Sequence, residues 1–177
     1  MARGILLTLF SGYLMLASSP AFSEESPTAD SKSKPAVRVS VAEARRQAEV
    51  LHTAMHATVQ LVHHRYYKLD EGLPIPAAVV DEIFSEIAAE QQVELRWLAV
   101  EGQAMNTDHI ARDDFEKAAV EALKAGKLSH EQVQDGILRR AAPITLSNQC
   151  LKCHVPDRKS TQDRKAGLII SIPVAER

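Results

Sequence analysis

The sequence predicts an α+β domain, because helical periodicity in the first half of the chain gives way to strand-like alternation in the second. Three observations carry this prediction. Residues 40–70 run without a helix breaker, residues 93–99 alternate, and residues 167–174 (GLIISIPV) form an apolar, strand-like run. The chain has 177 residues, of which 45% are hydrophobic, so it can bury one core of ordinary size.

The charge is nearly balanced, with 21 basic against 23 acidic residues. The formal net charge is -2, and no run of basic residues predicts binding to nucleic acid. We therefore expect no nucleic-acid partner.

The first 23 residues have the composition of an export signal. A short start containing Arg3 precedes an almost wholly apolar stretch, and Ala21-Phe22-Ser23 fits the pattern of a signal peptidase site. We expect cleavage near Ser23 and a periplasmic mature protein. The alternative is an uncleaved membrane anchor, since residues 4–22 approach the length that spans a bilayer.

The segment that follows, residues 24–38, is polar and rich in Ser and Pro. It cannot bury enough apolar surface to offset its ordering entropy, which predicts a disordered linker. The folded domain is then residues 39–177.

Two helices are expected first. Ser40 and Glu43 have the spacing of a capping box, and this helix should end near residues 67–70. Pro76 suits the first turn of a second helix. Helical spacing assigns to its core face Val79, Val80, Ile83, Phe84, Ile87 and Ala88.

The second half should hold a third helix and a hairpin. Asp113 caps the helix, and Gly126 ends it. Asp135-Gly136 suits a tight two-residue turn between two strands. His130 lies before the hairpin in a polar turn region and is expected at the surface. The cysteine segment, expected as a short loop, and a polar loop occupy residues 145–165.

The decisive motif is CLKCH, with Cys150, Cys153 and His154. Haem carries two vinyl groups that can each form a thioether with a cysteine, and two intervening residues let one short segment reach both. His154 then reaches one face of the iron as proximal ligand. Such attachment is completed outside the bacterial cytoplasm, which agrees with the export signal. One covalent haem c is therefore predicted.

Three other interpretations of the two cysteines fit the sequence less well. A disulfide between Cys150 and Cys153 would close a very small loop and add little stability. A thioredoxin-like pair needs a βαβ setting, which the pattern does not offer. Zinc needs two further ligands at suitable spacing, and the chain has no second cysteine pair.

The second axial ligand is expected from the first helix. His52, His56 and His63 lie within about 40° of one another on a helical wheel. His56 is favoured, because it lies mid-helix where packing would fix it, ahead of His52 and His63. Met105 is the rival ligand and His109 a weaker one. Ordinary hydrogen-bonding roles are the alternative for each histidine.

Other side chains could contact the haem. Arg158, Lys159 and Arg164 could pair with its propionates, although a solvated loop is the simpler interpretation. Trp97 and Tyr67 could stack on the ring, or serve as core residues.

Together these segments resemble the Tll-like haem domain family. The resemblance covers about residues 40–175 and includes VELRWLAV, FEKAAVEALKAG, AAPITLSNQCLKCH and GLIISIPV. It implies a PAS-like antiparallel sheet with a long N-terminal helix, flanking helices and one c-type haem. It also implies a role in redox or gas sensing or in electron transfer. Some relatives use a cysteine thiolate as distal ligand, and this chain has no third cysteine.

The resulting expectation is an exported single-haem protein with a redox or electron-transfer role, and not an enzyme, since no distal acid–base constellation is recognisable. The alternative is a periplasmic redox or gas sensor acting through a partner protein. Expected partners are the cytochrome c maturation machinery and an unknown redox protein. A homodimer is compatible with the sequence, and membrane association is expected only if the export segment stays uncleaved.

Overall fold

The computed structural model describes residues 37–68, 71–102, 104, 106–155 and 159–175. The predicted export segment, nearly all of the predicted linker, Met105 and Arg158 lie outside the described residues. Arg38, which we assigned to the linker, already belongs to the domain, because its guanidinium donates to Val174 O at 3.1 Å.

The described chain contains the predicted helices and strands in the predicted order, together with two short helices. These elements are α1 (Val41–Arg65), α2 (Pro76–Gln91), β1 (Glu94–Leu98), the short 3-10 helix η2 (Thr107–His109), α3 (Asp114–Lys124), β2 (His130–Gln134), β3 (Ile137–Leu146), α4 (Asn148–His154) and β4 (Arg164–Pro173). The two short helices, η2 and α4, lie in segments where loops were expected. Between residues 37 and 175, the described helices include none that is long and apolar enough to cross a membrane.

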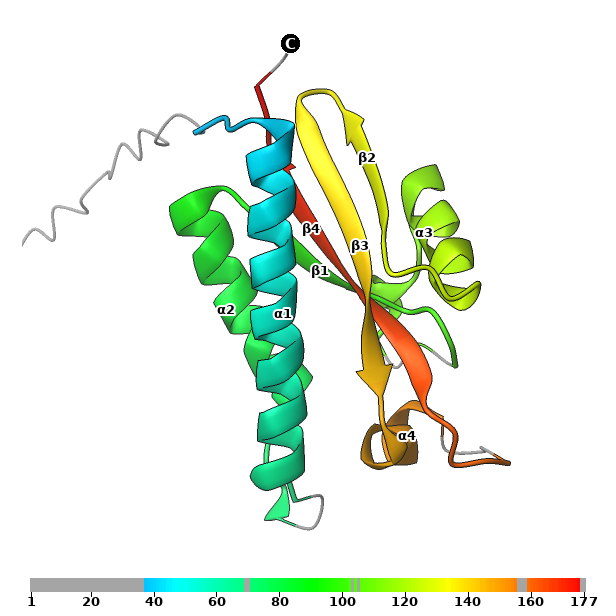
Figure 1. Cartoon of the computed structure of the whole chain (residues 1–177). Coiled ribbons are helices and arrows are strands. Elements are labelled where there is room, and N and C mark those ends of the chain that lie inside the picture. The colour runs from blue at the N-terminus through cyan, green and yellow to red at the C-terminus, as the bar shows by residue number, and fades with distance from the viewer. Residues whose placement is uncertain (1–36, 69–70, 103, 105, 156–158, 176–177) are drawn as a thin grey trace, which may run out of the picture. The chain divides into compact units, whose positions relative to one another are not determined.

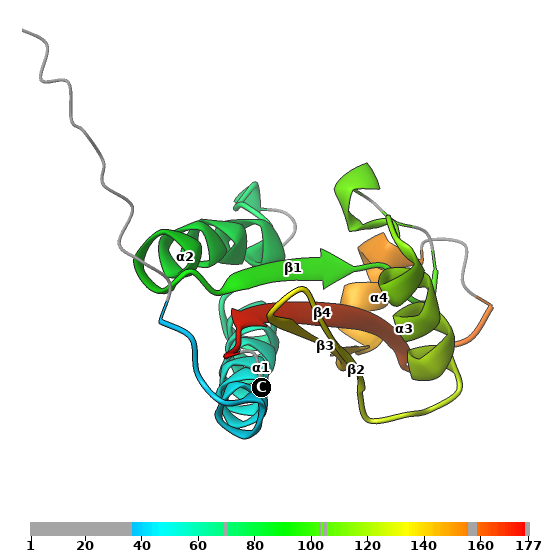
Figure 2. The same ribbon diagram turned by 90° about the horizontal axis from the view of Figure 1, so that it is seen from above.

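The four strands form one antiparallel sheet with the order β1-β4-β3-β2. Helices α1 and α2 lie against one face of this sheet and α3 against the other (Figures 1 and 2). The molecule is therefore an α+β domain with a PAS-like sheet, which confirms the predicted fold class.

Strand alternation builds the core on both faces. Leu95 and Trp97 of β1 join Leu168 and Ile170 of β4 beneath α1 and α2. On the opposite face Leu98 and Ile169 pack against α3, whose buried residues are Phe115, Glu116, Ala119, Ala122 and Leu123.

Local signals correctly located most element ends. Ser40 caps α1 by accepting a hydrogen bond from Glu43 N at 3.2 Å, and Asp113 caps α3 by accepting one from Glu116 N at 2.8 Å. Asp135 and Gly136 both have positive φ, 53° and 70°, as a tight hairpin turn requires.

Three expectations were wrong. Val79 and Ile83 of α2 are 44% and 40% exposed, because the α2 contact with the sheet is narrower than the apolar spacing suggested. His130 begins β2 and is half-buried, with its ring 5.3 Å from that of Phe115. The cysteine segment is a helix and not a loop.

Candidate functional site

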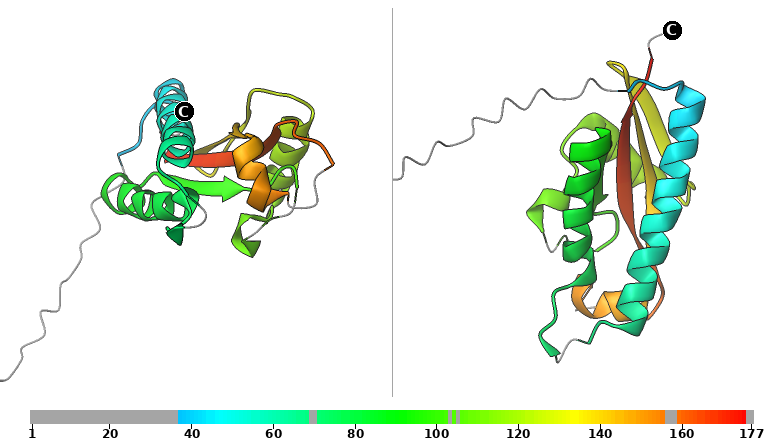
Figure 3. Two further views of the ribbon diagram at one scale, coloured as in Figure 1. Left: turned by 90° about the horizontal axis from the view of Figure 1, so that it is seen from below. Right: turned by 90° about the vertical axis from the view of Figure 1, so that its left-hand side faces the viewer.

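The cysteine motif lies on α4, at the end of the sheet where β3 ends and β4 begins (Figures 1 and 3). A helix of 7 residues is too short to be stable alone, so packing must stabilise it. Cys150 and Leu151 are buried against Leu146 of β3, and Val155 packs on the same cluster. The helix thereby fixes both the buried thiol of Cys150 and the half-buried thiol of Cys153.

A cavity of about 80 Å³ opens beside α4 and is lined by Cys150 and His154. His63 of α1 and His109 of η2 also line it. Most of the remaining wall is apolar and includes Val59, Ile75, Ala77, Leu98, Val100, Ile144, Leu146 and Ala166. Three imidazoles and one thiol therefore meet at a mostly apolar cavity.

The three imidazoles affect one another. Burial lowers the pKa of His154, and the nearby rings of His63 and His109 lower that pKa further. Burial also lowers the pKa values of His63 and His109 themselves. These shifts favour the neutral form of all three rings, which is the form in which an imidazole nitrogen can bind a metal.

The donor set suits a haem better than a bare metal ion. Among the residues that the structure describes, no group of three or more His, Cys, Asp or Glu side chains is arranged to hold a metal ion. A haem needs fewer protein ligands, because the porphyrin supplies the equatorial nitrogens and the protein supplies only the axial ligands. The cavity is smaller than a typical ligand pocket of roughly 300–1,000 Å³, so its walls must separate to admit a porphyrin.

The histidine stripe of α1 has a structural role along part of its length. Strand β2 pairs with β3 only as far as Ala141, and beyond this point α1 side chains bond to the β3 backbone. The His52 ring lies 3.1 Å from Pro143 O, and Gln60 donates to Thr145 O at 2.6 Å. In this part of α1, side chains replace β2 as hydrogen-bond partners of the β3 backbone.

The favoured distal ligand, His56, belongs to this structural part of the stripe. Its Nε2 accepts a hydrogen bond from Thr145 N at 3.4 Å, and its ring is 5.7 Å from that of His52. The stripe member that lines the cavity is His63, whose ring lies 4.9 Å from that of Tyr67. That His56 ligates iron stays a prediction.

The remaining candidates are dispersed. Trp97 is buried, lines the cavity and donates from Nε1 to Ala77 O at 3.3 Å. Lys159 is exposed, and Arg164 is half-buried at the start of β4. Trp97 is thus the candidate ring contact that the fold brings to the cavity wall.

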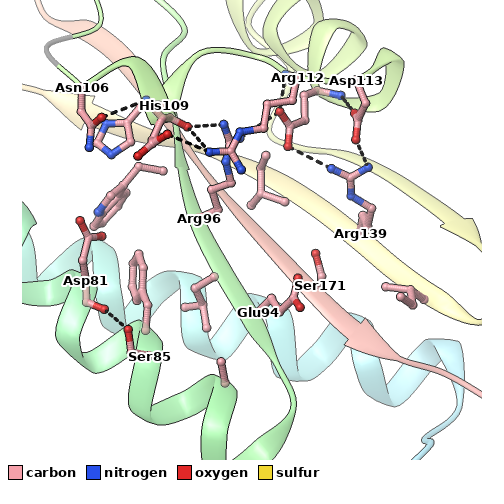
Figure 4. Close-up of a pocket in the computed structure, with 18 residues that line it drawn as sticks. Asp81, Ser85, Glu94, Arg96, Asn106, His109, Arg112, Asp113, Arg139 and Ser171 are labelled. Carbon is pink, nitrogen blue, oxygen red and sulfur yellow. Dashed lines mark hydrogen bonds and ion pairs between the residues drawn. The ribbon is translucent and has the colours of Figure 1, made fainter.

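A larger groove, of about 730 Å³, lies along the edge strand β1 (Figure 4). Its charged side chains are largely paired with one another. Glu116, only 3% exposed, lies 2.9 Å from Arg96 and 3.1 Å from Arg139, and accepts a hydrogen bond from Arg112 N at 2.7 Å. Arg139 also pairs with Asp113 at 2.6 Å. We interpret this network as structural.

The same network fixes the backbone around His109, which the sequence analysis gives as a weaker candidate ligand in a polar loop. Arg96 donates to the carbonyl oxygens of Asp108 and Ile110, on either side of His109. The backbone oxygen of His109 accepts from Ala99 N at 2.7 Å. No periodicity could have identified this arrangement, because it depends on contacts between β1, the η2 segment and α3.

Comparison with known proteins gives a family. The family model described as Tll0287-like matches residues 38–171. A structural match is the crystal structure of the cyanobacterial heme-protein Tll0287, with a TM-score of 0.58 and 16% sequence identity. The match covers 76% of this chain and 98% of the cyanobacterial chain, and at this identity it shows a shared fold. No curated protein matches the sequence. The chain belongs to the Tll0287-like family.

Proposed function

We propose that this protein binds one haem c through thioether bonds from Cys150 and Cys153, with His154 as the proximal iron ligand. The observation that carries the proposal is the position of α4, which holds the CLKCH motif against an apolar cavity lined by Cys150 and His154. The structurally similar cyanobacterial protein is described as a heme-protein, which supports the same cofactor here. A bound haem would supply a one-electron iron couple, tuned by its axial ligands and its burial.

The site is proposed to serve electron transfer or redox sensing, and not an enzymatic reaction. The chain's own contribution would be to orient His154, to bury the haem and to limit access of water. An enzyme would need a polar group placed to move protons at the distal side. Apart from the imidazoles, which the proposal assigns to the iron, and from Glu101, Gln60 and Thr145, the described cavity wall is mainly apolar.

A periplasmic location fits this chemistry, since thioether attachment takes place outside the bacterial cytoplasm. The supporting feature is the export-type composition of residues 1–23. The cytochrome c maturation machinery is then the obligatory partner, and a redox protein is the functional one.

The first test is co-expression of the full chain with cytochrome maturation factors, followed by acid–acetone extraction and a pyridine haemochrome spectrum. Haem colour should stay with the wild-type polypeptide, and mass spectrometry should find one haem adduct. Cys150→Ser and Cys153→Ser should each leave a single thioether and shift the haemochrome maximum, while the double variant should lose all covalent haem. Complete extraction of colour from the wild type would overturn the proposal.

The distal ligand requires its own comparison. The position of His63 in the cavity wall favours it as the distal ligand, whereas the helical pattern of the sequence favours His56. We propose His52→Ala, His56→Ala, His63→Ala and His109→Ala as a matched series, read by the spin state of the oxidised haem. The variant that converts a low-spin to a high-spin spectrum identifies the ligand. If all four stay low-spin, the ligand is not one of these histidines.

A further inference from the structure

We propose that Gly102 is a positioning residue for His154, so that the absence of a side chain at position 102 sets where the proximal imidazole stands. This inference rests on the proposed function, in which His154 binds the iron. Its geometric basis is a close approach: a Cβ built at Gly102 would lie 2.8 Å from Val155 Cγ2 and 3.2 Å from the backbone oxygen of His154. Real Cβ atoms essentially never approach another heavy atom as closely as 2.8 Å.

The segment that carries Gly102 is fixed to the sheet and cannot easily retreat. Glu101 N donates to Lys165 O at 2.9 Å, and Lys165 N donates to the Glu101 carboxylate at 2.6 Å. Just before it, Ala99 N donates to His109 O at 2.7 Å. These bonds hold residues 99–101 between the start of β4 and the η2 segment.

The opposing side of the contact is the last turn of α4. Val155 N donates to Leu151 O at 3.1 Å, and the Val155 side chain packs against the cluster that contains Cys150 and Leu151. The segment of residues 99–101 is held by β4 and cannot move away. An added methyl group at position 102 must therefore push on Val155 and on the His154 peptide group. A displacement there tilts the imidazole that lines the cavity.

The chain provides a close control. Gly102 has φ +92°, a conformation that strains any residue with a side chain. Gly126 has φ +88°, and nothing lies within 4 Å of a Cβ built on it. Gly102→Ala and Gly126→Ala therefore share the backbone strain, and the contact with His154 is particular to position 102.

The experiment compares the haem-loaded full chain as wild type, Gly102→Ala, Gly126→Ala and the double variant Gly102→Ala/Val155→Ala. We expect both single glycine variants to lose thermal stability, and Gly102→Ala to lose more, because only there must the added methyl group displace Val155. In Gly102→Ala alone we expect a larger high-spin fraction and a shifted reduction potential. The double variant removes the 2.8 Å partner and should return the spectrum toward that of the wild type.

Two results would overturn the inference: a Gly102→Ala spectrum and potential equal to those of the wild type, or an equal spectral change in Gly126→Ala. If Gly102→Ala does not fold, Val155→Ile approaches the same contact from the other side and should raise the high-spin fraction, and an unchanged spectrum there counts against the inference. A wild type without covalent haem instead refutes the proposed function, so the two failures are distinguishable.

Discussion

At the scale of single residues, the buried carboxylate of Glu116 is expected to contribute strongly to the free energy of unfolding. It is 3% exposed and pairs with two arginines while accepting a backbone hydrogen bond. We expect Glu116→Gln to lower the free energy of unfolding by about 2–3 kcal/mol, because Arg96 and Arg139 would lose a buried counter-charge. Urea unfolding of the apoprotein measures this change.

The matched control is Glu121→Gln on the same helix. Glu121 pairs with Lys124 at 3.1 Å, but its side chain is 74% exposed, and such surface pairs contribute little. Its unfolding midpoint should stay at the wild-type value. Equal losses in the two variants would mean that the buried network is not what stabilises α3 against the sheet.

His52 gives the apoprotein a pH-dependent stability. Burial lowers the His52 pKa in the folded state, and the hydrogen bond to Pro143 offsets part of this effect. The unfolded chain takes up a proton near pH 6.5, where the folded chain does not yet do so. The unfolded state therefore binds more protons, and the free energy of unfolding falls as the pH drops through this region.

We expect His52→Gln to make this pH profile less steep, even if it lowers stability at every pH, while the other histidines with lowered pKa values keep the remaining slope. Denaturant titrations of the apoprotein between pH 5 and pH 8, roughly the interval in which histidine titrates, measure the slope. His64→Gln serves as the control, because His64 is an exposed residue on the same helix. A His52→Gln profile as steep as that of the wild type would contradict the assignment.

At the scale of elements, the turn between β2 and β3 depends on a glycine. Gly136 has φ +70°, and its carbonyl accepts a hydrogen bond from Val174 N at 2.8 Å. Gly136→Ala should lower the free energy of unfolding by about 1 kcal/mol, because alanine pays for the left-handed conformation. Asp135→Asn should be neutral or slightly stabilising, since Asn-Gly is favoured in this turn; thermal unfolding compares the two variants.

The elements show how far sequence reasoning reaches. Helix α1 and the hairpin were predictable, because local groups such as Ser40 and Gly136 define them. Helix α4 was not, because a helix of 7 residues owes its existence to packing against β3 and β4. Periodicity overestimated the core face of α2, where Val79 and Ile83 are exposed. Helical spacing shows which residues form an apolar stripe, but it does not show how much of that stripe the sheet and α1 cover.

The candidate site divides in the same way. The CLKCH motif could be recognised from the sequence, because the residues that its chemistry needs are neighbours in the chain. His63 and His109 were among the candidate ligands, but the sequence could not show that these two meet His154, because they come from α1 and from the η2 segment and converge only in the folded cavity. His52 and His56 bond to the β3 backbone because β2 stops pairing with β3 at Ala141. The sequence does not show where this pairing stops, so it could not predict these bonds.

At the scale of the whole molecule, access to the cavity separates a carrier from a sensor. Three imidazoles line the cavity, and each could occupy an axial position of the iron. If a histidine occupies the sixth position, an incoming gas must displace a ligand held by a packed helix. We therefore expect the reduced haem-loaded protein to bind carbon monoxide slowly and weakly, as an electron carrier would.

Rapid mixing with carbon monoxide, followed at the Soret band, tests this expectation. His63 is the histidine of α1 that lines the cavity, and His63→Ala should make binding fast by opening the sixth position. His64 is exposed on the same helix, and His64→Ala should react as slowly as the wild type. Fast and tight binding by the wild type would instead favour the gas-sensing alternative, because an open or weakly held position is what a gas-responsive haem needs.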